Sequence, residues 1–110
     1  LAAEFDTGGD LPAGWVRKPL HSREGANIEL HLADGQRLHS DGPYAGPSIR
    51  QAAHPLPAFD GHYPMVGSWI VGDHACGIGI REDDSPITRD SARFVPHAIV
   101  EADAPATFYA

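Results

Sequence analysis

The segment YPMVGSWIVGDHACGIGIREDDSPITRDSAR, residues 63–93, predicts a tight β-hairpin followed by an arginine and a group of acids. The Gly-Asp pair at residues 72–73 marks the turn between the two strands. In the second strand Cys76, Ile78 and Ile80 alternate with glycine, so side chains stand on one face only. A glycine-bare strand face lets a flat group lie against the backbone. We therefore expect this face to carry function.

The rest of the chain also favours short antiparallel strands. Glycine and proline make up 22 of the residues, and no window keeps an apolar period of 3.6 residues. Asp-Gly pairs at residues 34–35 and 60–61 predict further turns, and residues 63–71 are apolar on both faces, which is typical of a central strand. Residues 1–13 are expected to form a loop, and residues 48–53 and 93–100 are expected to form two further strands. The pair at residues 85–86 predicts one helical turn. The expected fold class is α+β, dominated by short antiparallel β-strands.

Size and charge narrow the function classes. A chain of 110 residues fits one domain, residues 1–110, with residues 101–110 as a tail. The formal charge of -7 argues against binding a nucleic-acid backbone. One cysteine and no apolar run long enough to span a membrane predict a reduced, cytoplasmic setting with no membrane partner. The start at Leu1, without leader character, leads us to expect a piece of a longer protein.

A strand, a lysine, a small-residue loop and a second strand follow one another in residues 15–32. Lys18 comes at the end of the first strand, because Pro19 cannot donate to a ladder. Consecutive amides in the polar loop at residues 21–27 can form an anion-binding nest, and the lysine adds a compact positive charge. The pattern is compatible with a phosphate cradle, but the spacing alone favours an ordinary loop with a solvated lysine.

Other chemistry-bearing residues allow more than one interpretation. Arg81, at the end of the glycine-striped strand, is suited to clamp a carboxylate or a phosphoryl group. Asp83 and Asp84 belong either to a solvated turn or to a Mg²⁺ site, for which two neighbouring acids are weak evidence. Cys76 alternates in phase with isoleucines, which favours a buried apolar role over a nucleophile. None of the seven histidines has metal-binding spacing, so no metal ligand is predicted here.

Three strings resemble the glutathionylspermidine synthase family: WVRKPLHSREGAN (15–27), PAFDGHYPMVGSW (57–69) and GIGIREDDSPITRDSARFVPH (77–97). The resemblance is to the C-terminal part of the ATP-grasp synthetase domain of this family. It implies an ATP-dependent C–N ligase that activates a peptide-like carboxylate as an acyl phosphate, which an amine attacks to form an amide. It also implies ATP and Mg²⁺ as cofactors and the remainder of a longer chain as a partner.

The resemblance assigns a role to each matching position. Lys18 would hold nucleotide phosphates, residues 22–26 would close over them, and Arg81 would stabilise the transferred phosphoryl group. Residues 51–54 would meet adenine, Met65 would line that pocket, and residues 86–88 would pass near the nucleotide. The implied nucleotide-binding residues are Lys18, Ser22, Arg23, Gly25, Ala26, Gln51, Ala52, Ala53, His54, Met65, Pro86, Ile87 and Thr88, and the implied catalytic residue is Arg81.

The resemblance has gaps. The family's Mg²⁺ ligands lie earlier in its sequence, so we expect the metal ligands outside this segment and expect the isolated segment to be inactive. Asp90 and Met65 depart from the family pattern, which leaves the amine and the carboxylate open. The alternative is a non-catalytic β-rich binding or scaffold module. The enzymatic interpretation requires Lys18, Gly25, Gln51 and Arg81 to face one cleft.

Overall fold

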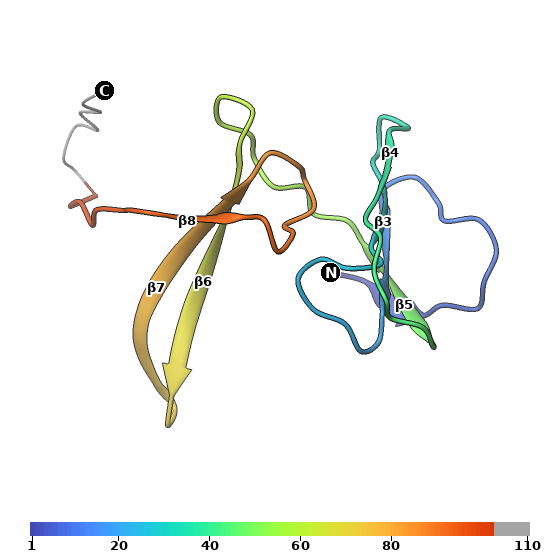
Figure 1. Ribbon diagram of the computed structural model, residues 1–110, viewed down its shortest axis with the longest axis horizontal. Helices are drawn as coiled ribbons and strands as arrows, with labels where there is room; N and C mark the ends of the chain where they lie inside the picture. The colour runs from blue at the N-terminus through green and yellow to red at the C-terminus, as the bar shows by residue number, and fades with distance from the viewer. Residues whose placement is uncertain (103–110) are drawn as a thin grey trace.

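A computed structural model describes residues 1–102 as two antiparallel β-sheets joined by residues 53–62 (Figure 1). The five-stranded sheet has the order β1-β5-β2-β3-β4, and the three-stranded sheet has the order β6-β7-β8. The strands are β1 (Ala3–Phe5), β2 (Trp15–Pro19), β3 (Glu29–His31), β4 (Arg37–His39), β5 (Ser48–Ala52), β6 (Tyr63–Val71), β7 (His74–Asp83) and β8 (Arg93–Val95).

The predicted α+β class is wrong, because residues 1–102 contain no helix and the fold is all-β. The helical turn expected at residues 85–86 is a loop instead. Its backbone amides do not form a helical ladder: those of Ser85 and Arg89 both donate to the Asp83 carboxylate, at 3.1 and 2.9 Å. The Asp83 side chain thus accepts hydrogen bonds from backbone amides in a segment that would otherwise be free to form a helical turn.

The five-stranded sheet has two chemically different faces. Arg17 of β2 lies opposite Glu29 of β3 and Arg50 of β5, and Arg50 lies opposite Glu4 of β1. Three ion pairs of 2.6–2.7 Å follow on this face, joining Arg17 to Asp6 and Glu29 and Arg50 to Glu4. The other face of β2 is the pocket face described below.

Strand β1 was missed from sequence, where residues 1–13 were expected to be a loop. All three residues of β1 are exposed, so no apolar alternation marks it. Its backbone pairs with β5 in the register Ala3↔Gln51 to Phe5↔Ile49. Only the neighbouring strand, which is distant in sequence, makes this segment a strand.

The hairpin of β6 and β7 corrects two further predictions. Strand β6 is an edge strand, not a central one, and its residues Val66, Trp69, Ile70 and Val71 are 62–66% exposed. The register shifts after Trp69, which pairs with Gly77 while Ile70 pairs with Ala75, so the intervening cysteine is the extra residue of a bulge. The prediction that Cys76 is buried is therefore wrong, and its side chain is exposed.

The turns match the sequence prediction more closely. Asp60 and Gly61 have φ values of +49° and +78°, and the turn between β6 and β7 has φ values of +54° at Gly72 and +68° at Asp73. Both two-residue turns have the left-handed geometry that suits a hairpin. The Asp-Gly pair at residues 34–35 also connects β3 to β4, through a slightly longer loop closed by Leu32 and Gln36.

The C-terminal part of the described chain is short of regular structure. Strand β8 was expected to continue to residue 100 but ends at Val95, immediately before Pro96, which cannot donate to a ladder. Of the predicted tail, residues 101 and 102 are described and the others lie outside the described residues. Within residues 1–102, no helix is long and apolar enough to cross a membrane.

Candidate functional site: a pocket between the two sheets

A pocket of about 370 Å³ lies between the two sheets. Strands β2, β3 and β5 form one wall, and β6 with the loop after β7 forms the other. Most of the lining is apolar, with a few polar groups, which is the usual character of a small-molecule site. The lining residues are Leu1, Val16, Lys18, Gly25, Ile28, Leu30, Gln51, Ala52, Ala53, His54, Pro55, Met65, Pro86, Ile87 and Thr88.

Strand alternation explains how the five-stranded sheet builds its wall. Val16 and Lys18 point to the same face of β2, opposite the face that carries the ion pairs. Val16 lies directly opposite Leu30 of β3 and Gln51 of β5, so all four residues share this face. The Lys18 Nζ donates a hydrogen bond of 2.7 Å to the Gln51 Oε1. A cation and an amide therefore stand beside an apolar patch.

The opposite wall comes into close contact with Gly25, in the loop between β2 and β3. Gly25 has a φ of +66°, and a Cβ at this position would overlap the carbonyl oxygen of Thr88 and lie 3.1 Å from the Ile87 Cγ2. Ile87 is itself 6% exposed, one of three buried apolar residues in the described chain. Only glycine accommodates both the backbone angle and the approach.

The pocket brings together ten of the fourteen residues that the sequence assigned to a site. The other four lie elsewhere. Arg23 and Ala26 line a neighbouring cavity of about 650 Å³, which also reaches Gly25. Arg81 lines a third cavity of about 300 Å³, which shares Met65 with the pocket. Ser22 lines none of these three cavities. Lys18, Gly25 and Gln51 thus face one cleft, but Arg81 lies in the adjoining one, so the convergence of all four residues that the enzymatic interpretation requires is met by three of them.

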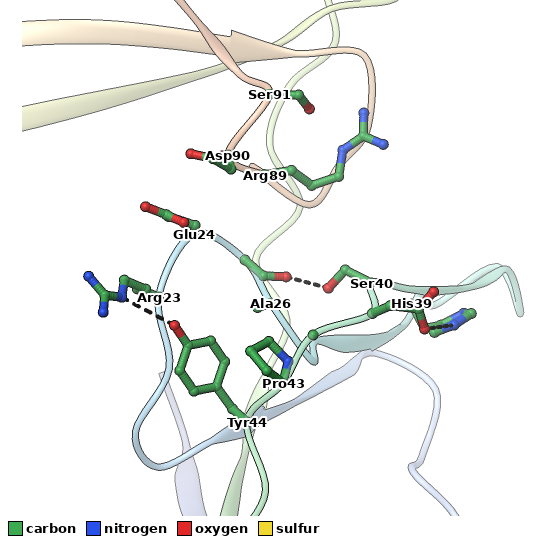
Figure 2. A pocket seen from close by; sticks show the side chains of 13 residues that line it. Arg23, Glu24, Ala26, His39, Ser40, Pro43, Tyr44, Arg89, Asp90 and Ser91 are labelled. Atoms are coloured by element: carbon green, nitrogen blue, oxygen red, sulfur yellow. Dashed lines mark hydrogen bonds and ion pairs between the residues drawn. The ribbon is translucent and has the colours of Figure 1, made fainter.

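Figure 2 shows the neighbouring cavity, with Arg23 and Tyr44 facing each other on one side and Arg89, Asp90 and Ser91 on the other. The Arg23 Nε donates to the Tyr44 hydroxyl at 3.1 Å. Ser40 donates to the Gly25 carbonyl, and Asn27 bonds to the backbone of Gly42 and Tyr44 at 3.0 and 2.9 Å. The loop predicted to close over phosphates is therefore tied to the loop that follows β4.

Two details of that loop bear on the predicted anion nest. The Ala26 amide donates to the Arg23 carbonyl at 3.1 Å, so this N–H already has a partner. Glu24 and Gly25 have φ values of +59° and +66°, so successive residues are left-handed. The loop is a compact turn whose shape comes from its own hydrogen bonds and from the segment after β4.

Arg81 lies on the glycine-bare face of the β6–β7 hairpin. Gly67 lies opposite Gly79, and Met65 lies opposite Arg81. The Arg81 guanidinium lies 5.6 Å from the centroid of the Phe94 ring and donates from Nη2 to the Arg89 carbonyl at 3.0 Å. The Arg81 Nε is buried and has no hydrogen-bond partner. A charged donor with an unused N–H borders a shallow, glycine-floored cavity.

The two neighbouring acids have different environments. Asp83 is 3% exposed, and the Arg89 guanidinium donates to its carboxylate from Nη2 at 2.5 Å and from Nε at 3.2 Å. These bonds lower the pKa of Asp83 to about 2. Asp84 is exposed, and hydrogen bonds from His62 and then Arg93 lower its pKa.

Both carboxylates already hold cationic partners, which argues against the Mg²⁺ alternative. Within residues 1–102, no group of three or more His, Cys, Asp or Glu side chains is arranged to hold a metal ion. The described residues therefore provide polar and apolar contacts for an organic ligand but no metal-binding set.

Comparison with known proteins finds the same family that the three quoted strings resemble. A family described as "Glutathionylspermidine synthase preATP-grasp" matches residues 1–100. The chain belongs to the glutathionylspermidine synthase family. A putative acid–amine ligase from Haemophilus influenzae is 43% identical over 93 residues, which are 78% of this chain and 24% of that protein.

Two relatives from Crithidia fasciculata match as well. A trypanothione synthetase is 37% identical over 91 residues, covering 80% of this chain and 14% of its own length. A glutathionylspermidine synthase is 43% identical over 51 residues, covering 46% of this chain and 7% of its own length. The chain thus spans about a quarter or less of each of these members of the family.

Sequence reasoning about the family missed five lining residues of the pocket, namely Leu1, Val16, Ile28, Leu30 and Pro55. A signal for three of them was present. Val16 stands two residues before Lys18 and so shares its face of the strand, and Leu30 alternates with Ile28 in the following strand. No local pattern marks Leu1 or Pro55.

Proposed function

We propose that this chain is part of an ATP-dependent carboxylate–amine ligase and that the pocket between its sheets is the nucleotide site. The observation that carries the proposal is the meeting of Lys18, Gly25, Met65, residues 51–54 and residues 86–88 in one pocket. The family resemblance assigns nucleotide contacts to these positions, and they come from both sheets. The names of the relatives, an acid–amine ligase and two synthetases, support the reaction class.

The lining residues fit a nucleotide chemically. Val16, Leu30, Met65 and Ile87 offer apolar surface to a flat base, and residues 51–54 offer backbone and side-chain groups at its edge. The Lys18 ammonium has three donors and uses one of them on Gln51. The remaining donors are suited to phosphate oxygens, with each charge-assisted bond contributing roughly 1.5 to 3 kcal/mol.

In this proposal ATP activates a peptide-like carboxylate as an acyl phosphate, and an amine then forms the amide bond. Phosphoryl transfer depends mainly on positioning and on electrostatic stabilisation. Arg81 is the group proposed to stabilise the transferred phosphoryl, because this cationic residue lines the cavity next to the pocket. Only the chemical class of the amine and of the carboxylate is proposed, since Asp90 and Met65 depart from the family pattern.

The metal is proposed to be held by other parts of a longer chain. The Asp83 and Asp84 carboxylates are engaged by Arg89, His62 and Arg93, so they are poor candidates for Mg²⁺ ligands. Turnover is accordingly proposed for the full-length protein and not for this segment alone. The cytoplasm is the proposed location, because an exposed single cysteine suits a reducing compartment.

The first test is calorimetric titration of Mg·ATP into the full-length protein and into its Lys18→Ala variant. We expect the variant to bind at least about tenfold more weakly, which corresponds to one lost charge-assisted contact. Arg37→Ala is the matched control, since it removes an exposed cation of β4 that lines none of the cavities described. Equal affinity in Lys18→Ala would remove the lysine from the site.

The second test addresses Arg81. Arg81→Ala should lower kcat by roughly 100- to 1,000-fold, the usual loss when one donor to a transition-state charge is removed. Unchanged turnover would mean that Arg81 has another role. If the folded, unaltered protein binds no Mg·ATP, the chain fits the alternative of a non-catalytic β-rich scaffold module.

A further inference from the structure

The loop at residues 83–89 is closed by a single buried carboxylate. Asp83 accepts hydrogen bonds from the Ser85 amide at 3.1 Å, the Arg89 amide at 2.9 Å and the Arg89 Nε and Nη2 at 3.2 and 2.5 Å. The Ser85 hydroxyl in turn accepts from the Ile87 amide at 3.2 Å. We call this arrangement, Asp83 with Ser85 and Arg89, the carboxylate clasp.

The clasp acts on two groups of the proposed site at once. Residues 86–88, which it encloses, form the pocket wall that faces Gly25. The carbonyl of Arg89, at the end of the clasp, accepts the hydrogen bond from the Arg81 Nη2 at 3.0 Å. A shift of this loop would therefore move the wall of the pocket and release the guanidinium of Arg81 together.

We infer that Asp83 and Arg89 are positioning residues whose ion pair holds both the nucleotide-facing wall at residues 86–88 and the orientation of Arg81. The inference rests on the proposed function of the pocket. Neither residue lines the pocket itself, so their effect is exerted through the loop. Small displacements of positioned groups can reduce turnover by about 100-fold.

The charge state of the clasp supports this role. Arg89 keeps the pKa of Asp83 near 2, so the carboxylate is ionised throughout the neutral range. The groups facing it are the guanidinium of Arg89 and the amides of the loop. A buried carboxylate with this many donors is well satisfied, and removal of its charge would leave the donors of Arg89 and the loop competing for weaker acceptors.

The neighbouring acid provides a matched control. Asp84 is ionised as well and also pairs with an arginine, Arg93, at 3.3 Å. Its side chain is 62% exposed, however, and its partners His62 and Arg93 line none of the three cavities. Asp84→Asn thus makes the same chemical change one residue away without touching the clasp.

The experiment compares Asp83→Asn with Asp84→Asn in the full-length protein by Mg·ATP calorimetry and steady-state kinetics, well below the thermal midpoint of each variant. Asp83→Asn should weaken Mg·ATP binding by about tenfold and lower kcat/KM by about 10- to 100-fold. Asp84→Asn should change both by less than about threefold. Equal behaviour of the two folded variants would overturn the inference.

A double-mutant cycle with Arg81→Ala separates positioning from a general loss of stability. If the clasp acts on kcat through Arg81, the double variant Asp83→Asn/Arg81→Ala should be little slower than Arg81→Ala alone, within about threefold. Fully multiplicative losses in kcat would overturn the link to Arg81. A merely structural effect on stability would not produce this non-additivity.

The half-exposed Arg89 offers a second route if Asp83→Asn does not fold. Arg89→Lys should retain a larger part of the Mg·ATP affinity than Arg89→Ala, because the lysine keeps the charge. Equal affinity of both variants with the unaltered protein would overturn the inference. If the unaltered protein binds no Mg·ATP, the proposed function fails, whereas binding that is insensitive to Asp83 and Arg89 leaves that function standing and removes only the clasp.

Discussion

The two sheets of this chain differ in how their side chains are paired and buried. The five-stranded sheet covers one face with ion pairs centred on Arg17 and Arg50, and its apolar face borders the pocket. The β6–β7 hairpin of the three-stranded sheet leaves Trp69 and Ile70 exposed at its far end. Near the pocket, by contrast, Asp83 at the end of β7 and Ile87 in the loop that follows are both buried.

The buried side chains are concentrated near the junction of the two sheets. The buried apolar residues of the described chain are Leu11 in the loop between β1 and β2, Leu30 in β3 and Ile87 in the loop after β7. The far end of the hairpin contributes almost nothing to this small core. The proposed site therefore lies where the two sheets meet, and substitutions should matter most at that junction.

The largest effect is expected at Gly25, which lies in close contact with the loop at Ile87 and Thr88. Gly25→Ala adds a Cβ that overlaps the Thr88 carbonyl and forces alanine into a left-handed backbone angle. Together these should lower the free energy of unfolding by about 3 kcal/mol, measured by urea denaturation. Gly14→Ala is the control, since Gly14 has a similar φ of +81° but no atom within 4 Å of the added Cβ. Similar losses in the two variants would contradict a close approach of the sheets.

A smaller difference in the free energy of unfolding is expected between the ion pairs of the two sheets. Arg17 is 21% exposed in its side chain and bonds to Asp6, Glu29 and the Gly9 carbonyl at 2.6–2.7 Å. Arg17→Ala should lower the free energy of unfolding by about 2 kcal/mol.

The comparison is Arg93→Ala in the three-stranded sheet, whose side chain is 53% exposed and whose ion pairs are 3.3–3.5 Å long. We expect this variant to lose no more than about 0.5 kcal/mol in the same denaturation experiment. A larger loss for Arg93→Ala than for Arg17→Ala would reverse the ranking of the two sheets.

The clasp gives the junction a pH dependence. The pKa of Asp83 is lowered from 3.8 to about 2, chiefly by its hydrogen bond from Arg89. Its contribution to stability is therefore complete above about pH 4, where the unfolded carboxyl is also ionised, and is lost as the pH falls from about 4 to about 2. Allowing for the half-exposed Arg89, the contribution is about 1.5 kcal/mol.

The difference in unfolding free energy between the unaltered protein and Asp83→Asn, followed by denaturation at several pH values, should shrink over this pH range. Repeating the series with Asp84→Asn isolates the buried carboxylate from its exposed neighbour. A difference that stays constant from pH 5 to pH 2 would show that the pKa of Asp83 is not lowered by the clasp.

The smallest effect is expected at the far end of the hairpin. Trp69 is 66% exposed, so Trp69→Ser should change the free energy of unfolding by less than about 0.5 kcal/mol. Leu30→Ala, from the buried strand β3, is the positive control because it removes a buried side chain. A loss above about 1 kcal/mol for Trp69→Ser in the full-length protein would indicate that another surface covers the hairpin there.

Much of the local structure could be predicted from particular residues. The Asp-Gly pair at 60–61 and the Gly-Asp pair at 72–73 mark real turns, because these residues tolerate left-handed backbone angles. Strand β2 and the strand at residues 48–52 were also expected where they occur. The burial of Cys76 was predicted wrongly, because a bulge breaks the alternation on which the prediction depended.

The structure also gathers some of the residues predicted for the site into the pocket and leaves others outside it. The resemblance to the glutathionylspermidine synthase family selected residues that the fold gathers into one pocket, but it placed Arg23, Ala26 and Arg81 with them, and these line the adjoining cavities. The clasp was not foreseen. Asp83 and Asp84 are adjacent acids in the sequence, and only their surroundings show that Arg89 engages the first and His62 the second.

Strand β2, the β6–β7 hairpin, the tight turns and the family could be read from the sequence alone, since these depend on local backbone preferences and on strings of matching residues. The order of the strands, the edge position of β6 and the contact between Lys18 and Gln51, which are 33 residues apart, could be seen only in the folded chain. This is because strand pairing and side-chain contacts form between segments that are distant in the sequence. Their energies depend on burial and geometry that no local pattern contains.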